Sequence, residues 1–356
     1  MGRIRRGRGW LWGLVLGIGL LAGCGTAASS PNPRPHTPSH PFRVLAFWAS
    51  GTDVSLAPLG RESKAVTAFV PLFYSINPDG SITNRVDAPV LSQVRRLGIP
   101  VVPLFNTPGS QAFLGSILAR LNVAREVASL VRSQHYQGVD IDFEPAAPQY
   151  AAGLAAFLID LHDFLPRGSQ LYLDVVPSSG PAYRFAQITP EVTGYVLMSY
   201  DEHDDGSAPG PVAATDWVRA KLARFLASVP AAKVDLGVAF YGYDWINGTT
   251  HALTISLNAI PPQALAVARY DAASQEMHAV YVDAAGVQHD LWWETPQGIA
   301  AKMNLAVNDH LQGVAIWRFG YQTPALTQML TGVQTQRRRP LRARPGAPGH
   351  APRQPG

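Results

Sequence analysis

The stretch GVDIDFEP (Gly138–Pro145) carries three carboxylates at alternate positions. Because successive side chains of a strand point to opposite faces, Asp140, Asp142 and Glu144 share one face of an extended segment and three apolar side chains share the other. Like charges at this spacing raise one another's pKa, so the acidic row does not stabilise a strand. The pattern therefore predicts a strand whose carboxylates serve a function.

Short runs of β-branched and aromatic residues recur on both sides of this stretch. They cover residues 43–50, 65–74, 100–106, 138–144, 170–178, 194–201, 233–242 and 313–320. Most are separated by segments whose apolar residues have helical spacing, such as 87–98, 116–134, 151–165 and 214–229.

Eight strands that alternate with helices predict parallel pairing. Over the 295 residues of Phe42–Gln336 they predict a closed (β/α)₈ TIM barrel of the α/β class. The alternative, a doubly wound open sheet, would need a Gly-rich phosphate-binding turn that the sequence lacks.

The spacing between the last two predicted strands opens to 70 residues. There, HAVYVDAAGVQHDLWWE (278–294) alternates like a hairpin around Ala284–Gly286. We therefore expect a small α+β insertion at about 246–294 on the barrel rim. Trp292 and Trp293 of this hairpin either line a cleft or pack on the rim.

Polar residues stand where the predicted strands end. In a barrel of parallel strands the carboxyl ends meet at one mouth, which is where active sites are found. Besides the acidic row at the end of the fourth strand, the chain places there Asp174, Tyr200, Asp201, Tyr241, Trp317 and Arg318. We expect these side chains to converge.

Three interpretations of the acidic row compete. A solvated surface strand fits poorly, because barrel strands are covered on both faces. A divalent metal site lacks a nearby histidine pair and the spacing of an EF-hand loop. General acid–base chemistry fits best, because neighbouring carboxylates let one group keep a proton at neutral pH while the other is ionised. Glu144, at the strand end, is then the predicted acid.

The two ends of the chain contain a predicted targeting signal, a membrane anchor and a disordered tail. Four arginines and a short apolar run precede Cys24, as in a lipoprotein signal peptide (1–23) whose cysteine becomes the lipid-bearing N-terminus. The alternative is an uncleaved membrane anchor. Residues 24–41 are rich in Pro and Ser and predict a tether, and residues 337–356 predict an Arg/Pro-rich disordered tail. We expect an extracytoplasmic, membrane-attached monomer.

The charge distribution argues against nucleic acid. The chain has a net charge of +4, but its excess arginines lie in the two ends, and Phe42–Gln336 carries a net charge of −7. A basic groove is therefore not indicated. Cys24 is also the only cysteine of the chain, so no intramolecular disulfide can form.

Several motifs resemble those of glycoside hydrolase family 18, the chitinase-like enzymes. GVDIDFE is similar to the family signature DxxDxDxE, LMSYD (Leu197–Asp201) to its Met-x-Tyr-Asp, and GVAIWRFG (Gly313–Gly320) to its segment with a tryptophan beneath the sugar. The strings MSYDEHDDGSAPGPVA, FYGYDW and FYSINPDGSI resemble the branch of spore cortex-lytic N-acetylglucosaminidases.

The resemblance implies a substrate-assisted, retaining mechanism without metal or organic cofactor. Glu144 would be the acid and base, and Asp142 would hold the 2-acetamido group of the substrate. Asp140 would share a proton with Asp142. Tyr200 would hydrogen-bond the acetamido oxygen. The residues expected to contact the sugar are Trp317, Asp201 and Tyr241.

One position departs from the signature, because Gln137 replaces its first aspartate. We expect a charge deep in the series to be absent and the tuning of the other carboxylates to change. The predicted partner is a polysaccharide that contains N-acetylglucosamine, either the peptidoglycan of spore cortex or chitin. A wall-binding lipoprotein without catalysis is the alternative from another class.

Overall fold

The computed structural model describes residues 42–50, 56–144, 147–178 and 180–337, and in these a closed barrel of eight parallel strands is formed. β1 pairs with both β2 and β14, which closes the ring. The strands are β1 (Arg43–Trp48), β2 (Ala68–Ile76), β4 (Leu104–Asn106), β5 (Gly138–Asp142), β6 (Gln170–Val175), β7 (Gly194–Leu197), β8 (Val234–Ala239) and β14 (Gly313–Trp317). The predicted (β/α)₈ fold is confirmed.

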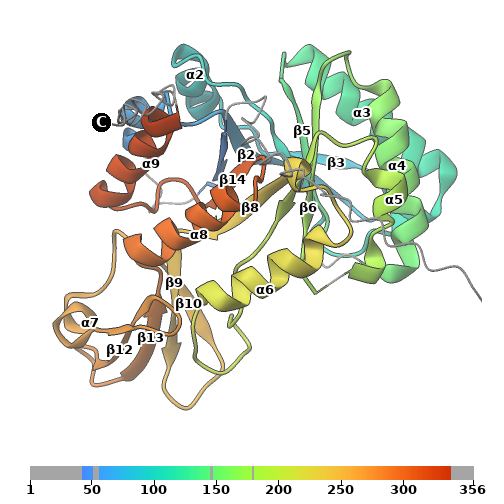
Figure 1. Ribbon diagram of the computed structural model, residues 1–356. Helices are drawn as coiled ribbons and strands as arrows, with labels where there is room; N and C mark the ends of the chain where they lie inside the picture. The colour runs from blue at the N-terminus through green and yellow to red at the C-terminus, as the bar shows by residue number, and fades with distance from the viewer. Residues whose placement is uncertain (1–41, 51–55, 145–146, 179, 338–356) are drawn as a thin grey trace, which may run out of the picture. The chain divides into compact units, whose positions relative to one another are not determined.

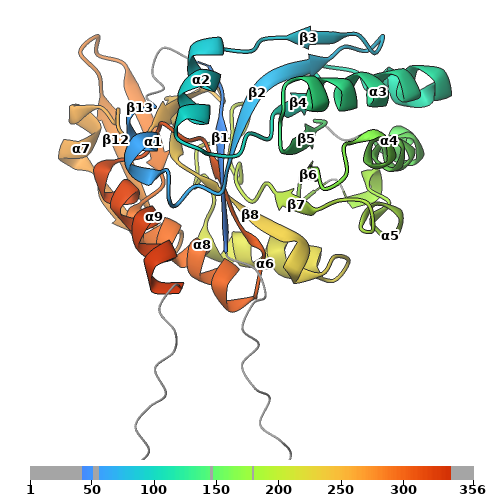
Figure 2. The same cartoon turned by 90° about the horizontal axis from the view of Figure 1, so that it is seen from above.

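Helices surround the strands on the outside (Figure 2). They are α1 (Ala57–Glu62), α2 (Ala88–Arg96), α3 (Ile117–Ser133), α4 (Ala151–Phe164), α5 (Phe185–Ile188), α6 (Thr215–Leu226), α8 (Pro296–Asn308) and α9 (Pro324–Arg337). Short 3₁₀ turns are η1 (Ala112–Gly115), η2 (Pro148–Tyr150), η3 (Gly180–Ala182) and η4 (Ala231–Lys233), and β3 (Ile82–Asn84) pairs antiparallel with β2.

α3 shows why these segments become helices. The hydroxyl of Ser116 accepts a hydrogen bond from the Ala119 backbone N–H and caps the helix start. Val123, Val127 and Val131 recur at intervals of four residues and are buried on one face. The helical spacing in the sequence thus decides which face packs on the barrel.

The barrel interior has an apolar side and an acidic side. Apolar side chains, among them Leu45, Val70 and Leu104, form a buried cluster inside the ring. On β5, β6 and β8 the strand register turns carboxylates inward at Asp140, Asp174 and Asp235, and all three are buried. The buried carboxylates therefore lie on one side of the barrel interior, and the site forms on that side of the mouth.

A second sheet, antiparallel and five-stranded, interrupts the chain between β8 and β14 (Figure 1). Its order is β10-β9-β13-β12-β11, with β9 (Tyr241–Ile246), β10 (Ala252–Ser256), β11 (Arg269–Asp271), β12 (Glu276–Val282), β13 (Gln288–Trp293) and helix α7 (Pro262–Val267). β12 and β13 form the expected hairpin, with Gly286 at a positive φ of 83° in its turn. The sheet begins at Tyr241, five residues before the expected start of the insertion, because Phe240 alone separates β8 from β9.

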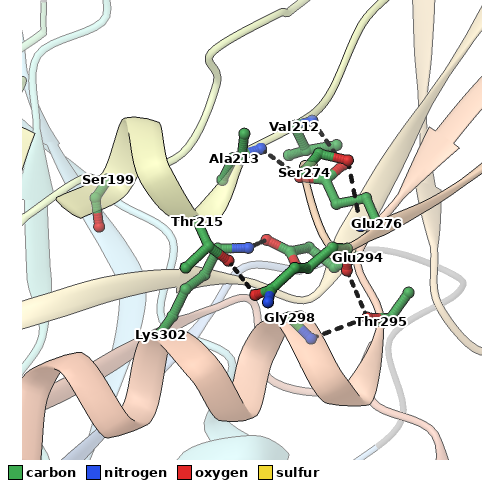
Figure 3. A network of polar contacts seen from close by, with 12 residues as sticks. Ser199, Val212, Ala213, Thr215, Ser274, Glu276, Glu294, Thr295, Gly298 and Lys302 are labelled. Carbon is green, nitrogen blue, oxygen red and sulfur yellow. Dashed lines mark hydrogen bonds and ion pairs between the residues drawn. The ribbon is translucent and has the colours of Figure 1, made fainter. Parts of the chain in front are cut away.

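A buried polar network joins this insertion sheet to the barrel (Figure 3). The Glu276 carboxylate accepts hydrogen bonds from the backbone N–H groups of Val212 (2.8 Å) and Ala213 (2.7 Å). Burial raises the pKa of Glu276 to about 8; the charge of Glu294 adds to the rise, while Lys302 and the two N–H groups oppose it. Lys302 pairs with Glu294, and both side chains are fully buried.

In the part of the chain that the structure describes, no helix combines the length and the apolarity needed to cross a bilayer. The predicted signal peptide, Cys24, the tether and the tail from 338 onward lie outside the described residues.

Removing Lys302 from the network tests its contribution to stability. We expect Lys302→Met to lower the free energy of unfolding by about 3–5 kcal/mol, because it leaves the Glu294 carboxylate buried without its partner. The loss should be larger at pH 8 than at pH 5, where Glu294 can take up a proton. Urea unfolding at both pH values measures it.

The matched control is Arg219→Met, which removes an exposed arginine from its pair with Asp216 and should change stability little. Equal losses in the two variants would contradict a special role of the buried pair.

Candidate active site

A cavity of about 450 Å³ opens at the carboxyl ends of the barrel strands. Side chains from different strands line it, namely Asp142, Glu144, Asp174, Tyr200, Asp201 and Trp317. All six were expected at the mouth, and five of them, all but Asp174, had a predicted role; the structure brings them together.

The acidic row alternates as expected along β5 and beyond it. Asp140 is fully buried, Asp142 is half-buried and Glu144 is exposed. Burial raises the pKa of Asp142 well above its usual range, and the charge of Glu144 and a hydrogen bond to it add to the rise. Burial therefore favours the neutral form of Asp142, which hydrogen-bonds Glu144.

Asp174, on β6, was expected at the mouth, but the sequence assigned it no role there. It hydrogen-bonds Asp140, and burial followed by the charge of Asp140 raises the pKa of Asp174 well above its usual range. Burial raises the pKa of Asp140 to about 7, an effect that the hydrogen bond from Asp174 partly offsets. Asp140 thus interacts with Asp174 on the neighbouring strand, and its charge also raises the pKa of Asp142, so the expected sharing of a proton between Asp140 and Asp142 stays a prediction.

Tyr200 follows β7 and faces the carboxylates. Burial raises its pKa well above the usual value, and the charges of Asp174 and Glu144 add to this rise. Its hydroxyl therefore keeps its proton and is a permanent hydrogen-bond donor at the cavity.

Asp201 has a positive φ of 61° and is held by two tyrosines. The hydroxyls of Tyr241 and Tyr243 (3.0 Å) both donate to its Oδ1 atom. Asp201 is exposed at the cavity, but the protein atoms around it desolvate the carboxylate in part and raise its pKa to about 6, although these hydrogen bonds oppose the rise. Asp201 is thus fixed in orientation at the cavity.

Tyr241 was predicted to contact the substrate, but it is buried and lies behind Asp201. Its ring meets that of Tyr200 edge to face, with centroids 6.2 Å apart. Tyr241 therefore supports Asp201 and Tyr200 and is not itself part of the cavity wall. Tyr243 was missed; the FYGYDW string places it two residues further along the same strand face.

Trp317, at the end of β14, lines the cavity with a half-buried indole. Its ring packs edge to face on Phe47 of β1, with centroids 6.1 Å apart. An indole held in this way offers a rigid apolar surface to a ligand.

Gln137 does not belong to the carboxylate series. It is exposed at the start of β5, where its Oε1 accepts from the Val101 N–H (2.6 Å) and its Nε2 donates to the His135 carbonyl (3.2 Å). By alternation it shares a face with the outward residues of the strand, not with Asp140. The expected loss of a deep charge is therefore wrong, because this position ties strand starts together.

Among the described residues, no group of three or more His, Cys, Asp or Glu side chains is arranged to hold a metal ion.

A parallel barrel that gathers proton-sharing carboxylates, a tyrosine and an indole at its mouth has the equipment of a glycoside hydrolase. The family model of Glycosyl hydrolases family 18 matches residues 108–322, and the chain belongs to this family. The matched range contains the whole acidic row and the segments that end at Asp201 and Trp317.

Individual relatives agree with this assignment. The chain is 30% identical over 267 residues to the "Putative sporulation-specific glycosylase YdhD" of Bacillus subtilis, covering 69% of this chain and 64% of that protein, so it spans slightly less than two thirds of that relative. It is 26% identical over 305 residues to the cortical fragment-lytic enzyme of the same organism, covering 77% and 70%. The crystal structure of a chitinase from Chromobacterium violaceum superposes with a TM-score of 0.73 at 25% identity, covering 82% of this chain and 98% of that one.

The buried carboxylates make stability depend on pH. Since the pKa values of Asp140, Asp142 and Asp174 are raised on folding, the folded chain binds more protons than the unfolded chain above about pH 4, and its stability falls as pH rises toward 8. Asp174→Asn should make this fall shallower and stabilise the protein at pH 8 by about 1–3 kcal/mol. Its amide still donates to Asp140.

The measurement is the free energy of unfolding in urea at pH 5, 6, 7 and 8. Asp216→Asn, an exposed aspartate on α6, is the control and should follow the wild type. An identical slope in Asp174→Asn and wild type would show that Asp174 holds no extra proton.

Proposed function

We propose that this chain is a glycosidase that hydrolyses N-acetylglucosamine linkages in peptidoglycan, specifically that of the spore cortex. The observation that carries the proposal is that Asp142 and Glu144 lie together on the wall of one cavity, beside Tyr200 and Trp317. One carboxyl group that keeps a proton beside one that is ionised is what acid catalysis at a glycosidic oxygen requires.

The proposed reaction is substrate-assisted. When the N–H of the substrate's 2-acetamido group donates to Asp142, the shared proton resides on Glu144, which transfers it to the glycosidic oxygen as the anomeric C–O bond breaks. The acetamido carbonyl oxygen attacks the anomeric carbon from the opposite face. Glu144 then removes a proton from water, which opens the cyclic intermediate, and two inversions retain the configuration.

The surrounding side chains have supporting roles in this scheme. The Tyr200 hydroxyl donates to the acetamido oxygen, and the Trp317 indole lies under the sugar ring. Asp140, hydrogen-bonded to Asp174, acts through its charge, which raises the pKa of Asp142. Asp201 accepts a hydrogen bond from a substrate hydroxyl in the orientation that its two tyrosines impose.

The choice of polymer draws on the relatives. Two of them have names that refer to sporulation or to spore cortex fragments, which supports cortex peptidoglycan. The likeness to a chitinase over 98% of its length supports chitin oligosaccharides as a second candidate substrate. We also propose attachment to the outer face of a membrane through lipid on Cys24, a position outside the described residues.

Digestion of purified spore cortex peptidoglycan by the full chain tests the proposal, with chitin oligosaccharides in parallel and products read by mass spectrometry. We expect new N-acetylglucosamine reducing ends from cortex, and a rate about 10²–10⁴-fold lower for Glu144→Gln, which cannot exchange a proton. The control Glu126→Gln, an exposed acid on α3, should retain full activity.

Binding of cortex by the wild type without any cleavage of cortex or chitin would replace this proposal with the wall-binding alternative. Cleavage of chitin alone would select the second substrate.

Restoring the aspartate of the family signature tests the reading of position 137. Gln137→Asp should change kcat and the pH profile by less than about twofold, because the side chain lies on the outward face of β5. It should lower the melting temperature slightly, since the shorter side chain cannot reach the Val101 N–H. A tenfold change in kcat, measured on the same substrate, would show instead that this position tunes the carboxylates.

A further inference from the structure

A lysine stands at the cavity among acidic side chains. The described residues that line the cavity include five carboxylic acids, namely Asp142, Glu144, Asp174, Asp201 and Asp204. Among these described lining residues, Lys221 is the only lysine or arginine. The reaction proposed above gives this positive charge no role.

Helix α6 directs Lys221 toward the cavity. Val218 and Leu222 are buried on the face that packs on the barrel. Trp217 and Lys221, four residues apart, share an adjoining face, and the Lys221 Nζ atom lies 5.2 Å from the centroid of the Trp217 ring. Trp217 packs against the core and also lines the cavity. The indole thus supports the lysine at the cavity without supplying a full counter-charge.

The start of α6 is tied to its surroundings by hydrogen bonds. The Thr215 hydroxyl donates to the Gln275 Oε1 atom of the insertion sheet (2.7 Å; Figure 3). The Ala214 N–H donates to the Glu202 carboxylate (2.9 Å). These contacts fix the first turn of the helix, so Lys221 is positioned at the cavity before any ligand binds.

Within the part of the chain that the structure describes, no carboxylate forms an ion pair with Lys221. The lysines and arginines that do form ion pairs there are Arg43, Arg120, Arg219 and Lys302. Burial raises the pKa of Glu202, and the charge of Lys221 opposes this rise less than the Ala214 N–H and the charges of His203 and Lys302 do. Lys221 is partly exposed, so its charge is available to a ligand.

An ammonium group in this position favours a ligand carboxylate. A hydrogen bond between two charged groups is stronger than one to a neutral hydroxyl. The acids on the rest of the wall repel an anionic group, so a ligand carboxylate would be directed to the lysine. Chitin carries hydroxyl and acetamido groups but no carboxylate. In peptidoglycan every second sugar bears a lactyl group, whose carboxyl group is free or joined to a peptide that ends in a carboxylate.

We propose that Lys221 binds a carboxylate of the substrate and thereby gives the cavity a preference for peptidoglycan over uncharged N-acetylglucosamine polymers. The inference rests on the proposed function, in that the cavity binds a glycan. The carboxylate belongs either to a lactyl group or to a peptide attached to it.

The test compares glycans that differ in charge. The ligands are a tetrasaccharide of alternating N-acetylglucosamine and N-acetylmuramic acid with free lactyl carboxylates, its neutral methylamide, and its L-alanine amide, which carries the carboxylate one residue further out. Calorimetry on the full chain uses the Glu144→Gln background, which suppresses cleavage. At least one carboxylated ligand should bind about tenfold more tightly than the methylamide. This preference should shrink as salt is added.

Variants at position 221 assign the preference to the lysine. Lys221→Met keeps an unbranched stem beside Trp217 but removes the charge, and the two dissociation constants should become nearly equal. Lys221→Arg keeps the charge and should retain most of the preference. Because the contact exists in the ground state as well as the transition state, Lys221→Met in the catalytically competent chain should raise KM for the carboxylated glycan.

The matched control is Arg219→Met, which removes an exposed cation from another face of the same helix and should keep the original preference. Equal binding of carboxylated and amidated glycans by the chain with Lys221 intact would overturn the inference without any variant at that position. A preference that persists in Lys221→Met would also overturn it. A preference for only the lactyl or only the alanyl ligand would support it and identify the source of the carboxylate.

Cleavage by the wild type, measured separately, distinguishes this inference from the proposed function. Cleavage of cortex or chitin together with equal binding of charged and neutral glycans would leave the glycosidase standing and remove the role of Lys221. A preference that depends on Lys221, in a chain that cleaves neither polymer, would keep the carboxylate site and remove the proposed catalysis.

Discussion

The structure depends on the burial of carboxyl groups inside a parallel barrel. Alternation on β5 and register on β6 turn Asp140 and Asp174 into the buried interior, where a charge removed from water is costly. Burial raises the pKa of both, and it also raises the pKa of the half-buried Asp142, which hydrogen-bonds Glu144 at the surface. Burial makes charged carboxylates costly inside the barrel, and the same burial keeps a proton available at the barrel mouth.

The groups around this pair are held by elements distant in sequence. Tyr200 and Asp201 stand on the segment between β7 and α6. Its far end is held by the Glu276 carboxylate of the insertion sheet, and Asp201 is held by two tyrosines of β9. The insertion sheet thus acts on the site through backbone and carboxylate hydrogen bonds, while the barrel supplies the reacting groups.

Local pattern was sufficient for most of the fold. Alternation predicted the acidic face of β5, and helical spacing predicted α3 and its buried valines, because both depend on the nearest neighbours in sequence. The hydrogen bond between Asp140 and Asp174 depends on how β5 pairs with β6, where Asp140 lies opposite Tyr172, and no local pattern encodes this pairing. Gln137 is different, since the alternation rule already assigns it to the outward face and only the family motif suggested otherwise. Tyr241 was misplaced because the single residue between β8 and β9 turns the chain behind Asp201.

The two N–H groups that Glu276 binds lie more than 60 residues away from it in the chain. The insertion sheet is consequently not an interchangeable module. A chimaera that carried the sheet of a relative onto this barrel would bury a glutamate without its donors, or two donors without their acceptor, unless residues 198–214 were transferred with it. Recombination within this family should therefore succeed at boundaries that keep these two distant segments from the same parent.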